Sequence, residues 1–390
     1  MKHLVIRQFG PIDEVDIELK RVNLIIGPQS SGKSTVLKVA CFCDWMERQI
    51  ELTQKPERYC DAETFVSNLI NFHRLKGYLK ADTYISYEND AVFFDFSEKA
   101  KKCTFRWKAD KRWKYKRVKI AYIPSERNLV AAIPNWYQVS MKQDNILDFM
   151  KEWEFARKAF SKGEAILDLP VKYKYSSNNS ADYIVLPNGK ELDLTVTSSG
   201  LQSLTPLYIM IHYLTSEYFK ETHTNVEQNI MKMRLQSVVA DECAQLSLEE
   251  QFDIVNTMMT PHHSDLFIEE PEAHIFPSTQ KSFVYGLVKM LNGSPKHTCF
   301  IATHSPYIMT TFNNVILAGE TSSESKEKAE KVSELMPRRQ TLRYKEVAAF
   351  EMKDGKIHSI MDDEFRLISA EALDGASEEI GKDFDYLLNL

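Results

Sequence analysis

The N-terminal part of the chain shows a pattern of apolar residues typical of β-strands. Leu4–Phe9 is a short, mostly apolar run that ends at Gly10-Pro11, and apolar residues largely alternate with polar ones from Ile12 to Leu19. Val22–Ile26 is then a compact apolar run of the kind found in strands buried on both faces of a sheet. The sequence therefore predicts three strands in succession, the third of them central.

Later apolar runs extend this pattern into an alternation of strands and helices. Residues 265–268 and 298–303 are expected to be buried strands, each followed directly by polar residues. Helix-type segments are expected after Lys33, over 146–166, and after Gly200. This order of elements predicts an α/β fold.

The residues after the third strand match a phosphate-binding loop. They read G-P-Q-S-S-G-K-S-T, which fits G-x-x-x-x-G-K-[ST] between an apolar strand and a helix. The motif therefore predicts an α/β fold of the P-loop NTPase type. The two glycines permit a tight turn that directs N–H groups at phosphate oxygens, and the helix adds the positive end of its dipole. Lys33 is expected to bridge the β- and γ-phosphates, and the Ser34 hydroxyl to ligate Mg²⁺. The residues predicted to bind ATP and Mg²⁺ here are Gly27, Pro28, Gln29, Ser30, Ser31, Gly32, Lys33, Ser34 and Thr35.

Two acidic residues follow the strand predicted at 265–268. Adjacent carboxylates at the end of a strand suit phosphoryl chemistry, because one can hold the metal while the next orients a water molecule. We assign Glu269 to the Mg²⁺ side and Glu270 to polarisation of the attacking water.

Two further polar positions are candidates for contact with nucleotide. His304 follows the strand at 298–303, where α/β sheets bind ligands, and is expected to sense the γ-phosphate. Ser199 and Gly200 stand at the start of a predicted helix, where they either bind an anion or simply cap the helix. The predicted catalytic residues are therefore Glu270, His304 and Lys33.

The order of these motifs resembles the ATP-binding-cassette class of ATPases. More narrowly, it is similar to the ATPase domain of the OLD (overcoming lysogenization defect) group, related to the Rad50, RecF and SMC heads. The segments that carry the resemblance are G-P-Q-S-S-G-K-S-T, Y-I-P-S-E-R, T-S-S-G-L-Q-S-L-T-P-L, F-I-E-E-P-E-A-H-I-F-P and I-A-T-H-S-P. The resemblance implies a two-lobed head, an antiparallel β lobe plus a mixed or parallel sheet flanked by helices, with helical insertions. It also implies that ATP lies between two copies, with Ser199 and Gly200 supplied by the second copy.

The chain departs from this pattern at two places. The metal-side position carries Glu269 instead of the commoner aspartate. The segment 122–127 has no glutamine that matches the expected lobe-coupling residue, so Arg127 is a candidate for that contact, with a structural salt bridge as the alternative.

The positions of the motifs divide one predicted ATPase domain, 1–390, into segments. Between 127 and 198 no heptad series is present, so we expect no long coiled-coil arm. The chain after His304 is too short for a Toprim nuclease domain of the OLD type, and we expect no nuclease. The predicted segments are 1–130 (first lobe with the P-loop), 131–190 (helical insert and return strand), 191–320 (signature, Walker B and His-switch lobe, with a helical insert at 216–263) and 321–390 (a small C-terminal β/α extension).

Composition and charge narrow the class of protein. With 49 Lys and Arg against 55 Asp and Glu, the net charge is −6, which excludes a uniformly basic nucleic-acid coat. No apolar run reaches the length of about 20 residues that a membrane-spanning helix needs. The first residues do not resemble a secretory signal, and the six cysteines form no C-x-x-C pair. We expect a cytoplasmic protein with reduced thiols and no membrane partner.

Two segments depart strongly from the average charge. Lys99–Lys119 holds eleven Lys or Arg and one acid, interleaved with aromatic residues, and is expected to form a β-hairpin. It either binds DNA or covers the core with its aromatic side while its cations are solvated. Asp362–Leu390 holds nine acids against two cations, and Asp362-Asp363-Glu364 within it is expected to be an exposed acidic turn, not a metal site.

The motifs predict an ATP-hydrolysing protein, and the resemblance implies that it dimerises head to head on ATP or forms a higher oligomer. Proteins of this resemblance act in DNA maintenance or phage defence, so we expect a sensor or regulatory subunit beside a separate effector protein. The alternative is a DNA-binding ATPase for DNA repair or genome maintenance.

Overall fold

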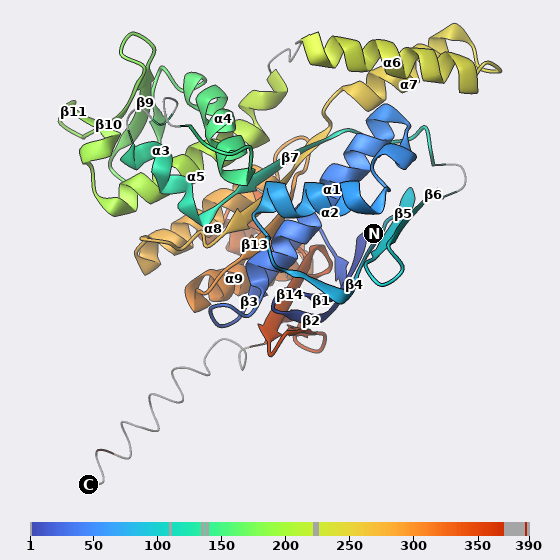
Figure 1. Cartoon of the computed structure of the whole chain (residues 1–390). Coiled ribbons are helices and arrows are strands. Elements are labelled where there is room, and N and C mark those ends of the chain that lie inside the picture. The colour runs from blue at the N-terminus through green and yellow to red at the C-terminus, as the bar shows by residue number, and fades with distance from the viewer. Residues whose placement is uncertain are drawn as a thin grey trace.

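Eleven strands of the computed structural model form one mixed sheet (Figure 1) in the order β6-β5-β4-β1-β2-β15-β14-β3-β13-β12-β7. The structure describes residues 2–108, 111–133, 136, 140–220, 226–369 and 387. The parallel part of the sheet consists of β3 (Val22–Ile26), β7 (Val118–Ile123), β12 (His263–Glu269), β13 (Thr298–Ala302) and β14 (Val347–Lys353). The remaining strands are β1 (Lys2–Phe9), β2 (Ile12–Leu19), β4 (Leu79–Glu88), β5 (Val92–Ser97), β6 (Lys102–Trp107) and β15 (Lys356–Ser359).

β15 joins the antiparallel and parallel parts into one sheet. It pairs antiparallel with β14 and meets β2 in parallel at Lys356 and Glu14. The strands predicted at the N-terminus and at 298–303 are confirmed, as is the α/β fold class.

Helices cover both faces of the parallel strands. The described helices are α1 (Lys33–Thr53), α2 (Ala62–His73), α3 (Leu129–Ala132), α4 (Asn145–Lys158), α5 (Ser199–Thr215), α6 (Val226–Glu242), α7 (Leu248–Met259), α8 (Pro277–Leu291), α9 (Pro306–Ser322) and α10 (Lys326–Leu335). Along β12, Leu266 and Ile268 point into a core shared with α5 and α8, whereas Phe267 points into the core shared with α1. Both sides of the strand are therefore apolar, as its sequence predicts for a strand buried on both faces.

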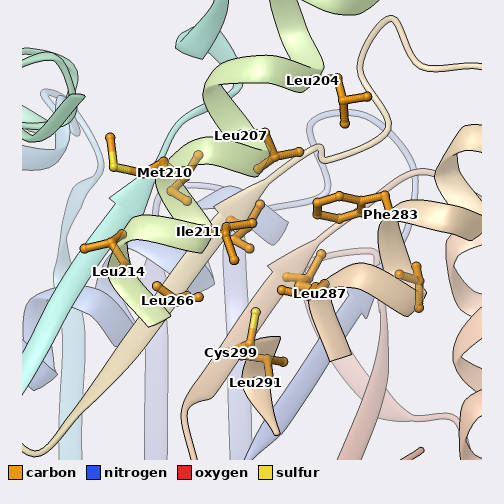
Figure 2. Packing of buried hydrophobic residues seen from close by; sticks show 14 of the residues in the cluster. Leu204, Leu207, Met210, Ile211, Leu214, Leu266, Phe283, Leu287, Leu291 and Cys299 are labelled. Atoms are coloured by element: carbon orange, nitrogen blue, oxygen red, sulfur yellow. The ribbon is translucent and has the colours of Figure 1, made fainter. Parts of the chain in front are cut away.

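The contact between α5 and α8 illustrates this packing. In Figure 2, Leu207, Ile211 and Leu214 of α5 face the same side of the helix, as residues three and four apart do. They pack with Leu287 of α8 and Leu266 of β12, and all five side chains are buried. The helix that starts at the predicted signature is thus anchored to α8, the helix that follows Glu269 and Glu270.

Smaller elements lie outside the main sheet. α6 and α7 form a hairpin that projects beside the end of α1 (Figure 1) and packs on it through Leu52, Leu235 and Val239. In the described part of the chain, no helix is both long enough and apolar enough to cross a bilayer. The small sheets consist of β8 (Glu164–Ala165), β9 (Lys172–Ser176), β10 (Ala181–Val185) and β11 (Glu191–Asp193), and of β16 (Met361–Asp362) with β17 (Leu367–Ile368).

Two local expectations are wrong. The helix expected over 146–166 ends at Lys158, and the chain turns at Gly163, whose φ of 91° favours glycine, into β8. The hairpin expected within Lys99–Lys119 does not form either, because β6 pairs with β5 and β7 pairs with β12. β6 and β7 therefore lie at opposite ends of the sheet.

Candidate functional site

The predicted site residues lie together because their strands are parallel neighbours. β13 pairs with both β3 and β12, so the carboxyl ends of these three strands share one edge of the sheet. The P-loop follows β3, Glu270 follows β12 and His304 follows β13. This edge is where open α/β sheets bind ligands.

The P-loop has the backbone that its glycines predict. Gly27 has a φ of 153° and Gly32 a φ of 109°, both in the region that favours glycine. A Cβ atom at Gly27 would lie 2.3 Å from the carbonyl oxygen of Met352, so a side chain does not fit there. Gly32 is the N-cap of α1, and the unpaired N–H groups of the first turn therefore face the loop.

Lys33 is buried at the floor of this loop. Its Nζ donates hydrogen bonds to the carbonyl oxygens of Gly27 (2.8 Å) and Pro28 (2.7 Å). Burial lowers the pKa of Lys33 to about 8, although the carboxylates of Glu270 and Glu272 oppose this shift. The Lys33 ammonium is thus held where an incoming phosphate group can replace the loop carbonyls.

An unused hydroxyl group also indicates that the loop fits an anion. Ser31 Oγ is buried and has no hydrogen-bond partner within the described residues. A buried hydroxyl without a partner is unfavourable, and a phosphate oxygen would supply the acceptor it lacks. Pro28, Gln29 and Ser30 form the exposed rim of the loop, and Ser34 and Thr35 begin α1.

Glu269 lies beneath this edge with its side chain already engaged. The hydroxyl of Tyr122 donates to Glu269 Oε1 (2.6 Å), and the backbone N–H of Ser125 donates to Oε2 (3.3 Å). Lys38 Nζ is 3.7 Å from Oε1. A carboxylate from Glu269 and a hydroxyl from Ser34 are oxygen donors of the kind Mg²⁺ prefers, so the chemistry of the predicted metal residues fits this ion.

Glu270 projects from a strained turn. Its φ is 41°, which is uncommon for a residue with a side chain, and its N–H donates to the carbonyl oxygen of Ala302 (2.8 Å). The Glu270 side chain is 41% exposed, and its Oε1 is 3.8 Å from His304 Nε2. The acid and the histidine therefore face each other across the ends of β12 and β13.

Glu272 joins the same turn, although we assigned it no role from the sequence. Its carboxylate accepts hydrogen bonds from the backbone N–H of His304 (2.5 Å) and from the hydroxyl of Thr303 (2.8 Å). Glu272 thereby fixes the backbone of His304. The sequence signal for Glu272 is the third acid in E-E-P-E-A-H. The contact of Tyr122 with Glu269 has no such signal, because it depends on the pairing of β7 with β12.

Arg127 is fully buried and holds the turn at 269–272, called the acidic turn below, through backbone carbonyl groups. Its guanidinium donates to the carbonyl oxygens of Glu269 (2.9 Å) and Glu270 (2.8 Å). A longer bond of 3.4 Å reaches the carbonyl oxygen of Ser203 in α5. Arg127 thus connects the acidic turn to the helix that begins at the predicted signature.

The predicted signature residues lie at an exposed helix start. Ser198 Oγ accepts a hydrogen bond from the N–H of Leu201 (3.4 Å) and caps α5. A Cβ atom at Gly200 would lie 3.1 Å from the carbonyl oxygen of His274, so this helix start is next to the acidic turn. Within the described residues, no hydrogen bond connects Ser199 or Gly200 to the P-loop of the same chain.

The basic segment is largely occupied by contacts within the chain. Arg112 forms an ion pair with Glu242 of α6 and lies over the rings of Trp107 and Trp113, at 4.2 and 4.8 Å from their centroids. Tyr115 is buried against α6 and α7. The cations that form ion pairs are Lys99, Lys101, Lys108, Arg112 and Lys119. The aromatic side chains therefore cover core elements, as the second of the two sequence interpretations expects.

The acidic residues at 362–364 have a structural explanation. Asp362 Oδ1 accepts the N–H groups of Glu364 and Phe365 (2.9 Å each), and Asp363 accepts the Tyr344 hydroxyl (2.7 Å). The groups thus close the turn between β16 and β17. The rest of the predicted acidic tail, apart from Leu387, lies outside the described residues from position 370 onwards.

No protein family and no curated protein matches this chain by sequence. Among solved structures, the chain is similar to the SMC head domain from Thermotoga maritima, with 10% identity and a TM-score of 0.40, over 92% of this chain and 97% of that chain. It is also similar to the Smc head domain with an extended coiled coil bound to the C-terminal domain of ScpA from Pyrococcus furiosus, with 9% identity and a TM-score of 0.38, over 97% of this chain and 100% of that chain.

A third similar structure is that of the recombination mediator protein RecF-ATPrS in the RecFOR pathway. The identity is 9% and the TM-score 0.31, over 92% of this chain and 97% of that chain. Because identities and TM-scores are this low, the three similarities carry no argument about activity. The assignment of the site rests on the side chains described above.

Proposed function

We propose that this protein binds and hydrolyses ATP at the carboxyl edge of β3, β12 and β13. The observation that carries the proposal is the convergence of four groups of different chemistry at that edge. A loop of N–H donors with the Lys33 ammonium faces two carboxylates and His304, and His304 Nε2 is 3.8 Å from Glu270 Oε1. This combination suits phosphoryl transfer, in which the protein positions the reactants and stabilises charge.

Each residue then has a role that follows from its position. Lys33 and the N–H groups of the P-loop bind the β- and γ-phosphates, and the free Ser31 hydroxyl donates to one of their oxygens. Mg²⁺ held by Ser34 and Glu269 would neutralise charge on the phosphate oxygens. Glu270 accepts a hydrogen bond from the attacking water, and His304 donates to the γ-phosphate. Glu272 and Arg127 act as positioning residues, because they hold the backbone of His304 and of the acidic turn.

We further infer that a second copy of the chain completes the site. Ser199 is exposed at the start of α5, a 17-residue helix whose N-terminal N–H groups suit an anion. No hydrogen bond joins Ser199 or Gly200 to the P-loop within the described residues, so we assign them to the nucleotide bound by a partner copy. ATP would then stabilise a head-to-head dimer.

A mixing experiment tests both parts of this proposal. Lys33→Ala removes the phosphate contact, and Ser199→Arg blocks the exposed helix start, so each variant alone should hydrolyse ATP slowly. A dimer with one copy of each contains one site with both residues intact, and mixing should restore about a quarter of the wild-type rate, because half of the dimers are mixed and each has one of two sites. No recovery in a mixture of folded, dimer-forming variants would contradict the shared site.

The biological role that we propose is a sensor or regulatory subunit of the OLD type that controls a separate effector in antiviral defence. The support is the sequence resemblance in motif order. A pull-down with the Glu270→Gln variant, which should remain in the ATP-bound form, tests this role. Recovery of the same proteins by Lys33→Ala would show that the capture does not depend on ATP.

A further inference from the structure

A cavity lies between α1, α2, α4 and β7. Its volume is about 190 Å³, and its lining includes Cys41, Trp45, Asn68, His73 and Tyr122. It is separate from the P-loop residues, none of which lines it. Apolar cavities of roughly 150 Å³ bind benzene, so this one has room for one aromatic ring or two small fused rings.

His73 lines this cavity and carries a buried ring nitrogen without a hydrogen-bond partner among the described residues. The residue is 1% exposed, and its Nδ1 has no partner among the described residues. Burial lowers the pKa of His73 to about 3, so the ring is neutral near pH 7 and offers one N–H and one acceptor nitrogen. A buried polar atom without a partner is unfavourable, and a ligand with a hydroxyl or N–H group would satisfy it.

The remaining wall is suited to a flat apolar ring. Phe42 and Trp45 stack at a centroid distance of 5.8 Å, and Phe72 lies edge-on to His73 at 4.9 Å. Aromatic rings favour such stacked and edge-on neighbours. Arg48, Asn68 and Asp148 provide the polar part of the lining.

Tyr122 connects this cavity to the proposed metal-side acid. Its ring lies edge-on to His73 at 5.5 Å, and its hydroxyl donates to Glu269 Oε1 at 2.6 Å. A ring bound in the cavity would pack against Tyr122 and restrict its motion. The hydroxyl would then stay on Glu269, and the carboxylate would be less free to hold Mg²⁺.

We propose that this cavity binds a small aromatic molecule carrying one hydroxyl or N–H group, and that its occupancy slows ATP hydrolysis through Tyr122 and Glu269. The binding half of this proposal is independent of the nucleotide site, whereas the regulatory half rests on the function proposed above.

Phenol and toluene are matched probes for the binding half, because they differ by a hydroxyl group in place of a methyl group. Calorimetry on the full chain should detect both, and His73→Leu should reduce the preference for phenol over toluene by about threefold to tenfold, the range for one hydrogen bond. Phenol that fails to bind, or an unchanged preference in His73→Leu, would overturn the site. If His73→Leu does not fold, NMR contacts between phenol and the Trp45 indole in the wild-type chain decide the question, and their absence overturns the site.

The regulatory half is tested with Tyr122→Phe, which keeps the ring in the wall and removes the hydroxyl that reaches Glu269. Phenol should slow ATP hydrolysis by the wild-type chain and should have little effect on Tyr122→Phe, although it binds both. Equal slowing of the two proteins, or none in the wild type, would contradict the coupling. Binding of phenol to a wild-type chain without any ATPase activity would instead overturn the proposed function and leave the cavity site standing.

Discussion

The carboxyl edge of the parallel strands and the basic segment Lys99–Lys119 differ in how separation along the chain relates to distance in the structure. The P-loop, Glu270 and His304 are far apart in sequence, yet the pairing of β13 with β3 and β12 brings them together. The basic segment is continuous in sequence, yet β6 and β7 at its two ends lie at opposite ends of the sheet. The candidate site residues therefore lie together where parallel strands end. A local run of charged residues does not by itself form a binding site.

The two regions also differ in what their charged groups contact. Among the described residues at the sheet edge, the Ser31 hydroxyl has no hydrogen-bond partner and Lys33 Nζ donates only to carbonyl groups of its own loop. In the basic segment, Arg112 already has Glu242 and two tryptophan rings as partners. The first arrangement leaves hydrogen-bonding capacity for a ligand, and the second uses it for folding.

Replacing one arginine in each region by alanine should give the largest difference, which is a difference in the free energy of unfolding. Arg127→Ala leaves the carbonyl groups of the acidic turn without their buried donor and should lower the free energy of unfolding by about 3–5 kcal/mol. Arg112→Ala removes a partly exposed ion pair and should lower it by only about 1 kcal/mol. Urea unfolding measures both, and equal losses would show that Arg127 does not hold the turn.

The second largest difference is expected in ATP affinity, when one lysine in each region is replaced by alanine. Lys33→Ala should weaken ATP binding by about tenfold to a hundredfold, since hydrogen bonds to charged groups contribute about 1.5–3 kcal/mol. Lys111→Ala, at an exposed position of the basic segment, is the matched control and should bind ATP like the wild type. Calorimetric titration gives both constants, and a similar loss in the two variants would place the nucleotide elsewhere.

The pH dependence of ATP binding offers a smaller test. The free chain holds Lys33 with a pKa of about 8, below the ordinary lysine value, so the ammonium that binds phosphate is lost as the pH rises through 8. ATP affinity should fall by about fivefold between about pH 8 and about pH 9, as the protonated fraction of Lys33 falls. In Lys33→Arg the guanidinium stays protonated and the affinity should be flat over this range. A flat profile for the wild type would contradict the contact with Lys33.

The smallest effect is expected from the exposed cations of the basic segment. Lys111, Lys114 and Lys116 are exposed and form no ion pair within the described residues. Changing all three to glutamate should alter DNA affinity at physiological salt by less than about threefold, because few phosphate contacts are available. A larger, salt-dependent loss in a binding titration would favour the alternative of a DNA-binding maintenance ATPase.

Much of the fold and the edge of the site could be predicted from the sequence. The runs before Gly27, Glu269 and His304 are short and mostly apolar, as is typical of parallel strands covered on both faces. Parallel neighbouring strands end at the same edge of a sheet, so the residues that follow these runs are expected to lie together.

The contacts that position these residues could not be predicted in the same way. Arg127 binds main-chain carbonyl groups, which every residue has, so no side-chain pattern marks its partners. The bond from Tyr122 to Glu269 depends on β7 lying next to β12, although β7 precedes β12 by more than a hundred residues. The interpretation of 99–119 as a hairpin was wrong because β6 pairs with the preceding strand β5 through a turn at 98–101.

The most direct test of the central claim compares ATP hydrolysis and ATP binding by the wild type and Glu270→Gln. The amide keeps the shape of the side chain but is a poor acceptor for the proton of the attacking water. Hydrolysis in single-turnover assays should fall by about a hundredfold to a thousandfold, and the affinity for ATP should stay within about twofold. A variant that hydrolyses ATP at the wild-type rate would contradict the assignment of this sheet edge as the catalytic site.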